Sequence, residues 1–195
     1  MDHKSKNKWN SIYSDVDIKK HSVSKGLLDN AHLIMNSGSA LDLACGTGGD
    51  AIFLASKGLT VDAWDISDAV IGKIARFASE NRLAINAEAR DINISPPENE
   101  SYDVITVAHY LERTLAPRLI AALKPGGLLF YQTFTQAVTP TYSGPSNSDF
   151  RLAENELLSL FRELRVVVYR EEGLLGDTSL GFRNEALLIA QKAVS

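Results

Sequence analysis

The chain has 195 residues, of which 45% are apolar and 23% are charged, an ordinary balance for a globular protein that favours one compact domain. A formal net charge of -4 and a pI near 5.6 argue against a nucleic-acid-binding surface, which needs clustered Lys and Arg. Its single cysteine excludes an intrachain disulfide, and no segment reaches the roughly 20 apolar residues of a membrane helix. We expect a cytoplasmic protein, a monomer or homodimer, with no leader peptide and no membrane partner.

From position 40 onward, short apolar runs alternate with segments of helical period, which is typical of an α/β sheet. Gly58 suits the position after a helix, and Ser67 is a good N-cap for the next helix. The expected strands, in chain order, are 40–44, 60–64, 86–90, 102–107, 128–134, 164–169 and 185–190. The expected helices among them are 49–57, 67–81, 114–123 and 154–161.

The segments between these elements carry further predictions. Residues 124–127 (Lys-Pro-Gly-Gly) are expected to break a helix and turn into the fifth strand. Residues 135–151 form an unusually long loop, which is typical of a lid or a substrate loop. The glycine-containing link 173–183 permits an antiparallel final pair of strands. Before the sheet, 22–36 has a partial helical period and could lie over the cofactor edge.

A glycine turn follows the first expected strand, in the run from Leu41 to Gly49. Gly46 and Gly48 would let a ligand approach the backbone at the carboxyl end of a parallel strand; the alternative is an unoccupied tight turn. The spacing also fits a dinucleotide fingerprint, so the glycines alone do not separate S-adenosylmethionine (SAM) from NAD. Asp42 favours SAM, because a carboxylate beside the turn repels a pyrophosphate but supports the ammonium end of a methionine moiety.

Asp65 ends the second expected strand, 19 residues beyond Gly46. An acid at this position can accept hydrogen bonds from two ribose hydroxyls, in SAM and NAD folds alike. The alternative is an acid stabilised by the N-terminal dipole of the helix that begins beside Ser67.

These motifs together resemble the class I SAM-dependent methyltransferases, across roughly positions 8 to 192. Residues 41–48 (Leu-Asp-Leu-Ala-Cys-Gly-Thr-Gly) match the first motif of that family, and 123–127 match its turn before strand five. The resemblance implies a Rossmann-like three-layer α/β sandwich, residues 39–195, with a mostly parallel seven-stranded sheet in the order 3-2-1-4-5-7-6 and strand seven antiparallel. Residues 1–38 would form an N-terminal helical lid. Trp9 and Tyr13 resemble the opening of the tellurite-resistance-type small-molecule methyltransferases.

The resemblance also implies which residues hold the cofactor. Asp91 would accept a hydrogen bond from the adenine amino group, or alternatively be a turn acid satisfied by nearby amides. The Ile92 amide would meet a ring nitrogen, and Ile66 would pack on the adenine face. Cys45 is expected to contribute backbone and a small buried side chain, with a nucleophilic role as the alternative. The predicted cofactor-binding residues are Asp42, Ala44, Cys45, Gly46, Thr47, Gly48, Asp65, Ile66, Asp91, Ile92 and His109.

His109 follows the fourth strand, where this fold places residues against the transferable methyl group. Its imidazole could take a proton from a substrate hydroxyl, thiol or amine, contact the cofactor or substrate, or be purely structural. Tyr110 is its companion as a candidate catalytic residue. Little acid or base machinery is obligatory, because methyl transfer from a sulfonium needs mainly alignment and exclusion of water.

The candidate acceptor-binding residues are mostly aromatic, with two arginines that could hold an anionic group. Trp9 and Tyr13 lie four apart, on one side of a short helix, and could close over the pocket or simply anchor the N-terminus. In and around the long loop, further residues could line the pocket or hold an anionic group, namely Phe134, Tyr142, Phe150, Arg151 and Arg183.

The sequence therefore predicts a SAM-dependent methyltransferase that acts on a small molecule. A SAM-binding module without catalysis is the alternative, since no single residue is indispensable for methyl transfer. An NAD-dependent oxidoreductase is disfavoured by Asp42. His3, His21 and His32 lack metal-ligand spacing, so no metal is expected.

Overall fold

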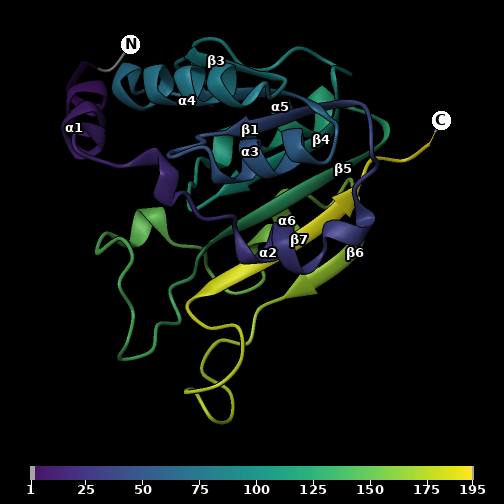
Figure 1. The fold of residues 1–195 in the computed structure, drawn as a ribbon. Helices are drawn as coiled ribbons and strands as arrows, with labels where there is room; N and C mark the ends of the chain where they lie inside the picture. The colour runs from purple at the N-terminus through teal and green to yellow at the C-terminus, as the bar shows by residue number, and fades with distance from the viewer. Residues whose placement is uncertain (1–2, 195) are drawn as a thin grey trace.

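A computed structural model describes residues 3–194, which form a seven-stranded sheet in the order β3-β2-β1-β4-β5-β7-β6 (Figure 1). Strands β1 to β5 pair in parallel, whereas β7 runs antiparallel to both β5 and β6. The predicted strand order and the antiparallel seventh strand are confirmed. The strands are β1 (Ser39–Leu43), β2 (Thr60–Asp65), β3 (Ile85–Ala89), β4 (Tyr102–Ala108), β5 (Leu123–Phe134), β6 (Arg165–Arg170) and β7 (Glu185–Gln191).

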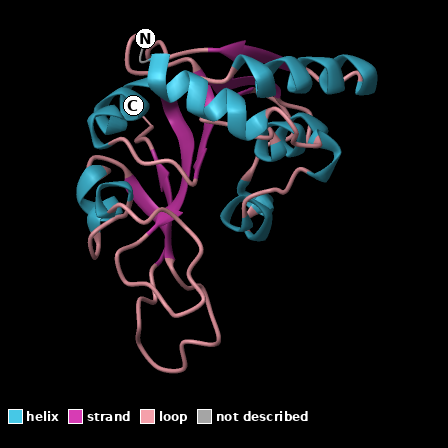
Figure 2. Ribbon diagram, turned by 90° about the vertical axis from the view of Figure 1, so that its left-hand side faces the viewer, coloured by secondary structure: helices cyan, strands magenta, loops and turns pink. Residues whose placement is uncertain are grey.

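Helices cover both faces of the sheet, as Figure 2 shows with the strands between two helical layers. The α-helices of the described residues are α1 (His3–Tyr13), α2 (Lys25–Asp29), α3 (Gly49–Ser56), α4 (Asp68–Asn81), α5 (Ala116–Ala122) and α6 (Glu156–Leu160). Short 3-10 turns add η1 (Ile18–Lys20), η2 (Ala31–Leu33), η3 (Arg113–Leu115) and η4 (Ser148–Phe150). No helix within residues 3–194 combines the length and apolar character that crossing a membrane requires.

The alternation of side chains along the central strands produces two apolar cores. Leu41 and Leu43 of β1 point to one face, where they pack in a cluster with Leu119 of α5. Ala40 of the same strand points to the other face, in a cluster with Ile74 of α4. Burial on both faces explains why the central strands read as continuous apolar runs, and it confirms the three-layer arrangement.

Two residues with a left-handed backbone mark the boundaries of the first βα unit, Ala44 after β1 and Gly58 after α3. The first strand ends at Leu43, one residue earlier than predicted, because Ala44 adopts a left-handed backbone conformation with φ of +57°. Helix α3 ends at Ser56, and Gly58 follows with φ of +100°, as predicted for the residue after a helix.

The preceding helix ends at Ala122, as the predicted break at 124–127 requires, but the turn predicted there is wrong because these residues lie inside β5. Leu123 pairs with Tyr102 and Leu128 pairs with Val104, so the extra residues of β5 bulge out between the two pairs. Gly126, with φ of +80°, supplies the conformation that the bulge needs. The helix predicted at 114–123 begins as a 3-10 turn and becomes α-helical from Ala116.

The helix expected within 22–36 is also broken, into α2 and η2. Its first amides bond to other elements, that of Ser24 to Asp50 and that of Gly26 to Gln132, whereas later amides such as that of Leu28 bond within the segment. The start of the segment does lie at the glycine turn, because the Ser22 carbonyl oxygen is 2.0 Å from where a Cβ on Gly49 would be.

The two long loops leave the sheet at a common end. Figure 1 shows the segment after β5 in green and the segment after β6 in yellow-green, both extending beyond the sheet away from β1 to β3. Because β4, β5 and β6 run in the same direction, these loops begin at the carboxyl edge, where parallel sheets bind ligands.

Candidate active site

The candidate residues gather at the carboxyl ends of three adjacent parallel strands. Leu43, the last residue of β1, pairs with Trp64 in β2 and with Val107 in β4. Asp65 and His109, each within two residues of these pairs, therefore lie on either side of the turn that follows β1.

Alternate residues of the glycine turn have a left-handed backbone conformation. Ala44, Gly46 and Gly48 have φ of +57°, +50° and +75°. The turn closes through a hydrogen bond from the Gly48 amide to the Cys45 carbonyl oxygen at 2.8 Å, and Gly48 is the N-cap of α3. Residues 44–47 are all partly exposed, so their backbone is available to a ligand. This geometry suits close approach of a polar ligand to the main chain.

Asp65 is tied directly to this turn. One carboxylate oxygen accepts from the Gly46 amide at 3.0 Å, and the other accepts from the Ser67 amide at 2.9 Å. The side chain is buried, and burial raises its pKa against the lowering effect of these amide donors. Each oxygen retains acceptor capacity after one bond, so the carboxylate can still receive hydroxyl donors. Asp65 also lies at the start of α4, as its alternative role requires. It accepts from the amide of Ser67, the N-cap that in turn accepts from the Val70 amide.

Asp42 binds the start of α3, directly after the glycine turn. It is buried at 2% exposure, and its carboxylate accepts from the Ala51 amide at 2.9 Å. Burial and the nearby Asp50 carboxylate raise the pKa of Asp42 well above its usual value. The contact seen is with the first turn of α3, where an acid also meets the positive end of the helix dipole.

A second buried acid, Asp50, was not predicted from the sequence. Its carboxylate accepts from the Ser24 amide at 2.7 Å, from the Ser24 hydroxyl at 2.8 Å and from the Thr106 hydroxyl at 2.9 Å. Asp50 therefore joins the N-terminal segment, the start of α3 and the strand β4. Its position directly after the glycine motif was the signal that could have found it.

The predicted adenine-binding residues lie just beyond β3. One Asp91 carboxylate oxygen accepts from the Asn93 amide at 3.2 Å, as the turn-acid alternative requires. Ile92 is buried in the core cluster of the α5 face, whereas Ile66 is partly exposed after β2. The Arg90 amide donates to the Asp65 carbonyl oxygen at 2.8 Å, which holds this segment beside the ribose acid.

Helix α1 brings the predicted aromatic pair to the glycine turn. Trp9 and Tyr13 stack with ring centroids 5.6 Å apart and an interplanar angle of 20°, which confirms that they share a helix face. The Tyr13 hydroxyl is 3.1 Å from where a Cβ on Gly46 would be. Burial, Asp65 and Cys45 raise the pKa of Tyr13 above its usual value. Tyr13 therefore lies on the predicted cofactor side of the site.

Three contacts hold α1 on α4, and one of them is the ion pair between Lys6 and Asp68 at 2.6 Å. The Asn10 side-chain oxygen accepts from the Ser67 hydroxyl at 2.7 Å and from the Ala69 amide at 3.2 Å. The Lys73 ammonium donates to three carbonyl oxygens at the end of α1, those of Tyr13 (2.8 Å), Ser14 (2.6 Å) and Val16 (2.9 Å). A cation at the end of a helix satisfies its last carbonyls and its dipole, so Lys73 fixes where Tyr13 lies.

His109 pairs with a residue that the sequence did not reveal. Its Nε2 is 3.1 Å from the Glu185 carboxylate, and its ring stacks on Phe134 with centroids 5.0 Å apart. The hydrogen bond to the Glu185 carboxylate is the main cause that raises the pKa of His109 above its usual value. The His109 side chain is 46% exposed, so a substrate can reach the ring.

Tyr110 has different neighbours from His109, although the two residues are adjacent. Its hydroxyl hydrogen-bonds the Asn93 side chain, and burial together with Glu112 raises its pKa to about 12. Asp91 and Asp65 also raise it, so Tyr110 lies nearer the predicted adenine side than the acceptor side. The structure does not bring the two predicted catalytic residues to one point.

Aromatic side chains continue from His109 into the long loop. Phe134 packs edge-on against Tyr142, with centroids 5.9 Å apart, and the Arg151 guanidinium lies 5.8 Å from the Tyr142 ring centre. Phe150 is exposed at 54% and stands outside this group. Phe134 and Tyr142 therefore form an aromatic wall beside His109.

Two further predictions differ from what is seen. Arg183 was expected to hold an anionic group, yet its guanidinium donates to the carbonyls of Gly173, Asp177 and Leu180 within its own loop. Cys45, expected to contribute a small buried side chain, is partly exposed as a whole residue but packs against the core cluster of the α4 face. Burial of its thiol and the nearby acids raise the pKa of Cys45 well above its usual value, which opposes a nucleophilic thiolate.

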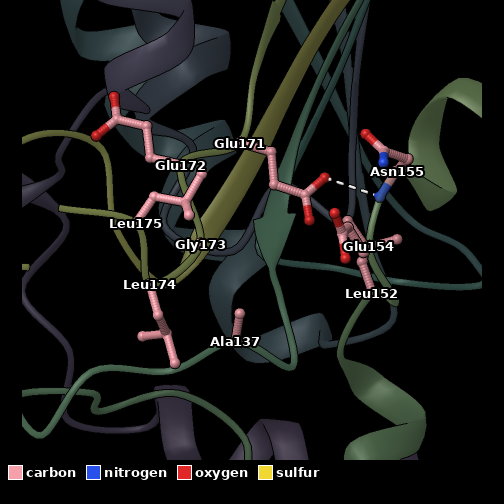
Figure 3. Close-up of a pocket in the computed structure, with 9 residues that line it drawn as sticks. All are labelled: Ala137, Leu152, Glu154, Asn155, Glu171, Glu172, Gly173, Leu174 and Leu175. Atoms are coloured by element: carbon pink, nitrogen blue, oxygen red, sulfur yellow. Dashed lines mark hydrogen bonds between the residues drawn. The ribbon is translucent and has the colours of Figure 1, made fainter.

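A cavity of about 360 Å³ lies beyond β6 and contains none of the predicted site residues (Figure 3). Figure 3 shows Glu171 and Glu172 pointing in opposite directions, with Glu171 bonded to the Asn155 amide at 3.1 Å. Glu172 is paired with Arg170. The cavity is lined by Ala137, Leu152, Glu154, Asn155, Glu171, Glu172, Gly173, Leu174 and Leu175. Among residues 3–194, no group of three or more His, Cys, Asp or Glu side chains is arranged to hold a metal.

A family model described as "Tellurite resistance protein TehB" matches residues 5–180. The chain belongs to this family. The match confirms the resemblance to the class I SAM-dependent methyltransferases that the motifs indicated, and SAM is the cofactor of that class.

Three relatives illustrate the range of proteins that the chain is similar to. It is 33% identical to hemagglutinin 1 of Eikenella corrodens over 147 residues (71% of this chain, 48% of that protein). It is 35% identical to the ubiquinone biosynthesis O-methyltransferase of Coxiella burnetii over 101 residues (49% and 43%). It is 29% identical to the probable S-adenosyl-L-methionine-dependent methyltransferase TehB of Haemophilus influenzae over 150 residues (73% and 51%). The chain therefore spans about half the length of these relatives.

The crystal structure of TehB from Haemophilus influenzae superimposes with a TM-score of 0.72 at 24% identity. The alignment covers 92% of this chain and 67% of that one. This similarity confirms the methyltransferase fold.

Proposed function

We propose that the chain is a SAM-dependent methyltransferase that acts on a small-molecule acceptor by in-line methyl transfer. The single observation that carries the proposal is the glycine turn after β1 with the Asp65 carboxylate bonded to its Gly46 amide. Membership of the TehB family supports the same activity. The O-methyltransferase named among the relatives supports a small acceptor.

The residues of the turn fit such a cofactor. Residues 44–47 offer a partly exposed backbone for the methionine moiety, with Asp42 behind it. Asp65 would receive the ribose hydroxyls with its remaining acceptor positions. Asp91, the Ile92 amide and Ile66 would hold the adenine ring, as in the family.

When bound, SAM supplies a methyl group on a positively charged sulfur, open to in-line displacement. The acceptor loses a proton as it gains the methyl group, and we assign the receipt of that proton to His109. Glu185 stabilises the imidazolium that results, because its carboxylate faces Nε2 at 3.1 Å. Phe134 and Tyr142 would hold a flat acceptor beside the ring.

Residues 1–38 would act as a lid over residues 39–195. The support is the position of Tyr13 on the glycine turn and the three hydrogen bonds from Lys73 that keep it there. Trp9, 38% exposed and stacked on Tyr13, would meet the acceptor from the lid side. Such a lid would exclude water from the methyl group.

The remaining expectations belong to this proposal as well. Tyr110, placed near Asn93, would contact the cofactor side instead of the acceptor. The cytoplasmic location, the monomeric or dimeric state and the lack of a nucleic-acid partner stay predictions from composition.

Equilibrium calorimetry with SAM, its demethylated product and NAD tests the cofactor. We expect SAM and the demethylated product to bind with one site per chain, and NAD to bind far more weakly. Preferential binding of NAD would refute the proposal. Tight SAM binding without turnover on thiols, amines and hydroxyls would favour the non-catalytic SAM-binding module.

A further inference from the structure

We propose that Glu185 and Gln132 are positioning residues that hold His109 in the Nε2–H tautomer, so that Nδ1 is the atom that receives the acceptor's proton. The inference rests on the proposed methyltransferase function and names the atom and the residues through which His109 would act in it.

The argument begins at α2, where the backbone fixes the orientation of a buried amide. The Gly26 amide lies 2.6 Å from the Oε1 of Gln132, whose side chain is only 5% exposed. A backbone N–H can only donate, so the amide oxygen of Gln132 must face it and the Nε2 group must face the other way. The approach is close, since a Cβ on Gly26 would stand 2.7 Å from that oxygen.

The Nε2 group of Gln132 then determines how Glu185 is used. It donates to the Oε2 of Glu185, which must be an acceptor there. The other oxygen of the same carboxylate, Oε1, is the one that lies 3.1 Å from Nε2 of His109. An ionised carboxylate only accepts, so the imidazole must donate from Nε2. In the neutral ring, the lone pair is therefore on Nδ1.

The backbone and the aromatic wall hold the ring where this tautomer matters. His109 has φ of +56°, a left-handed conformation that a non-glycine residue rarely adopts. Its amide donates to the Gln132 carbonyl oxygen at 2.9 Å, so the same residue fixes both the backbone and, through Glu185, the ring. Phe134 stacks on the ring at an interplanar angle of 30°. Strain of this kind is concentrated at functional positions.

The charges of nearby acids, like the hydrogen bond to Glu185, favour the protonated form of His109. The acids that face His109 are Glu185 and, at longer range, Asp50 across β4, and both raise its pKa. Removal of the Glu185 charge should therefore lower the pKa of His109. Since the ring accepts a proton only when neutral, the acid limb of kcat/KM should move to lower pH in that variant.

Nitrogen NMR of protein labelled at histidine tests the tautomer without cofactor or turnover. The chain has four histidines, and His109→Gln identifies the fourth signal by its loss. We expect the neutral ring of His109 to show a protonated Nε2 and an unprotonated Nδ1. Protonation at Nδ1 would overturn the inference, whether or not the protein transfers methyl groups.

Two variants separate positioning from simple stability. In Glu185→Gln, we expect the pKa of His109 to fall, because the hydrogen bond and the charge of Glu185 raise it, and we expect the tautomers to mix. Glu163→Gln, at an exposed position after α6, is the matched control and should change neither. In Gln132→Leu, Glu185 keeps its charge but loses the amide donor that positions it. Both tautomers of the neutral His109 ring should then be populated. An unchanged pKa and tautomer in Glu185→Gln would contradict the proposal even where the Gln132 variant fails to fold.

The inference and the proposed function can fail separately. Failure to bind SAM would remove the function and leave the measured tautomer as it is. Turnover that is intact in Glu185→Gln with an unmoved acid limb would remove the positioning role and leave the function.

Discussion

The cofactor side and the acceptor side of the candidate site are built from contacts of different range along the chain. On the cofactor side, the Asp42 carboxylate bonds the Ala51 amide nine residues away, and the Asp65 carboxylate bonds the Gly46 amide 19 residues away. On the acceptor side, His109 meets Glu185 across 76 residues.

The deepest contact of the acceptor side is longer still, since Gln132 and Gly26 are 106 residues apart. A local turn requires its glycines and acids at fixed spacings, and those spacings are visible as a motif. A contact closed by tertiary folding imposes no spacing. The cofactor side can therefore be read from the sequence, whereas the acceptor side needs the fold.

The largest effect is expected on the acceptor side. His109→Ala should lower kcat by about 10²- to 10⁴-fold, because a positioned general base contributes that much. SAM affinity should be unchanged, as the contacts of Asp65 with the turn stay intact. Steady-state kinetics across pH and calorimetry provide the two readouts. His32→Ala, at an exposed position, is the control, and full kcat of His109→Ala at every pH would refute the role of base.

The next effect concerns the cofactor side and is expected on SAM binding instead of on kcat. Asp65→Ala should weaken SAM binding by about 1 to 3 kcal/mol through loss of charged hydrogen bonds. Calorimetry measures it directly. The control is Glu80→Ala, an exposed acid near the end of α4. If Asp65→Ala and its control bind SAM equally well, Asp65 does not contact the cofactor.

A third change tests whether the turn and the N-terminal segment are packed as closely as described. Gly49→Ala places a Cβ 2.0 Å from the Ser22 carbonyl oxygen and should lower the free energy of unfolding by about 1 to 3 kcal/mol. Gly72→Ala, in the middle of α4 with nothing within 4 Å, should instead raise it by up to about 1 kcal/mol. Denaturant unfolding compares the two. Equal stability of both variants would contradict the close approach.

The smallest effect concerns the lid. Lys73→Met keeps the aliphatic stem but removes the three hydrogen bonds to the end of α1, so SAM affinity should fall several-fold, a loss of about 1 kcal/mol. Arg76→Met, an exposed position one turn along the same helix, is the control. Hydrogen exchange of α1 should quicken only in the Lys73 variant. Identical exchange in both variants would show that Lys73 does not hold the helix.

The fold was largely predictable, because burial on both faces of the central strands leaves apolar runs such as 102–107 in the sequence. The errors arose where backbone donors bond distant elements. The Gly26 amide in the first turn of α2 donates to Gln132 of β5, and residues 124–127 bulge within a strand because pairing with β4 continues past them.

The same reasoning separates the site residues. The place of Asp65 at the end of the second strand could be predicted, since strand and helix lengths fix its distance along the chain, but its bond to the Gly46 amide could not. Glu185 could not, since it is one acid among 24 acidic residues and only the antiparallel pairing of β7 with β5 brings it to His109. Tyr110 was predicted beside His109 by adjacency, but the two side chains meet different groups, Tyr110 the Asn93 side chain and His109 the Glu185 carboxylate.

The most direct test of the central claim is the formation of S-adenosylhomocysteine by the wild-type protein over a panel of small thiols, amines, hydroxyls and chalcogen oxyanions. We predict that at least one acceptor releases S-adenosylhomocysteine in step with the methylated product, and that His109→Ala slows this release. Tight SAM binding with no S-adenosylhomocysteine formed from any acceptor would contradict the account.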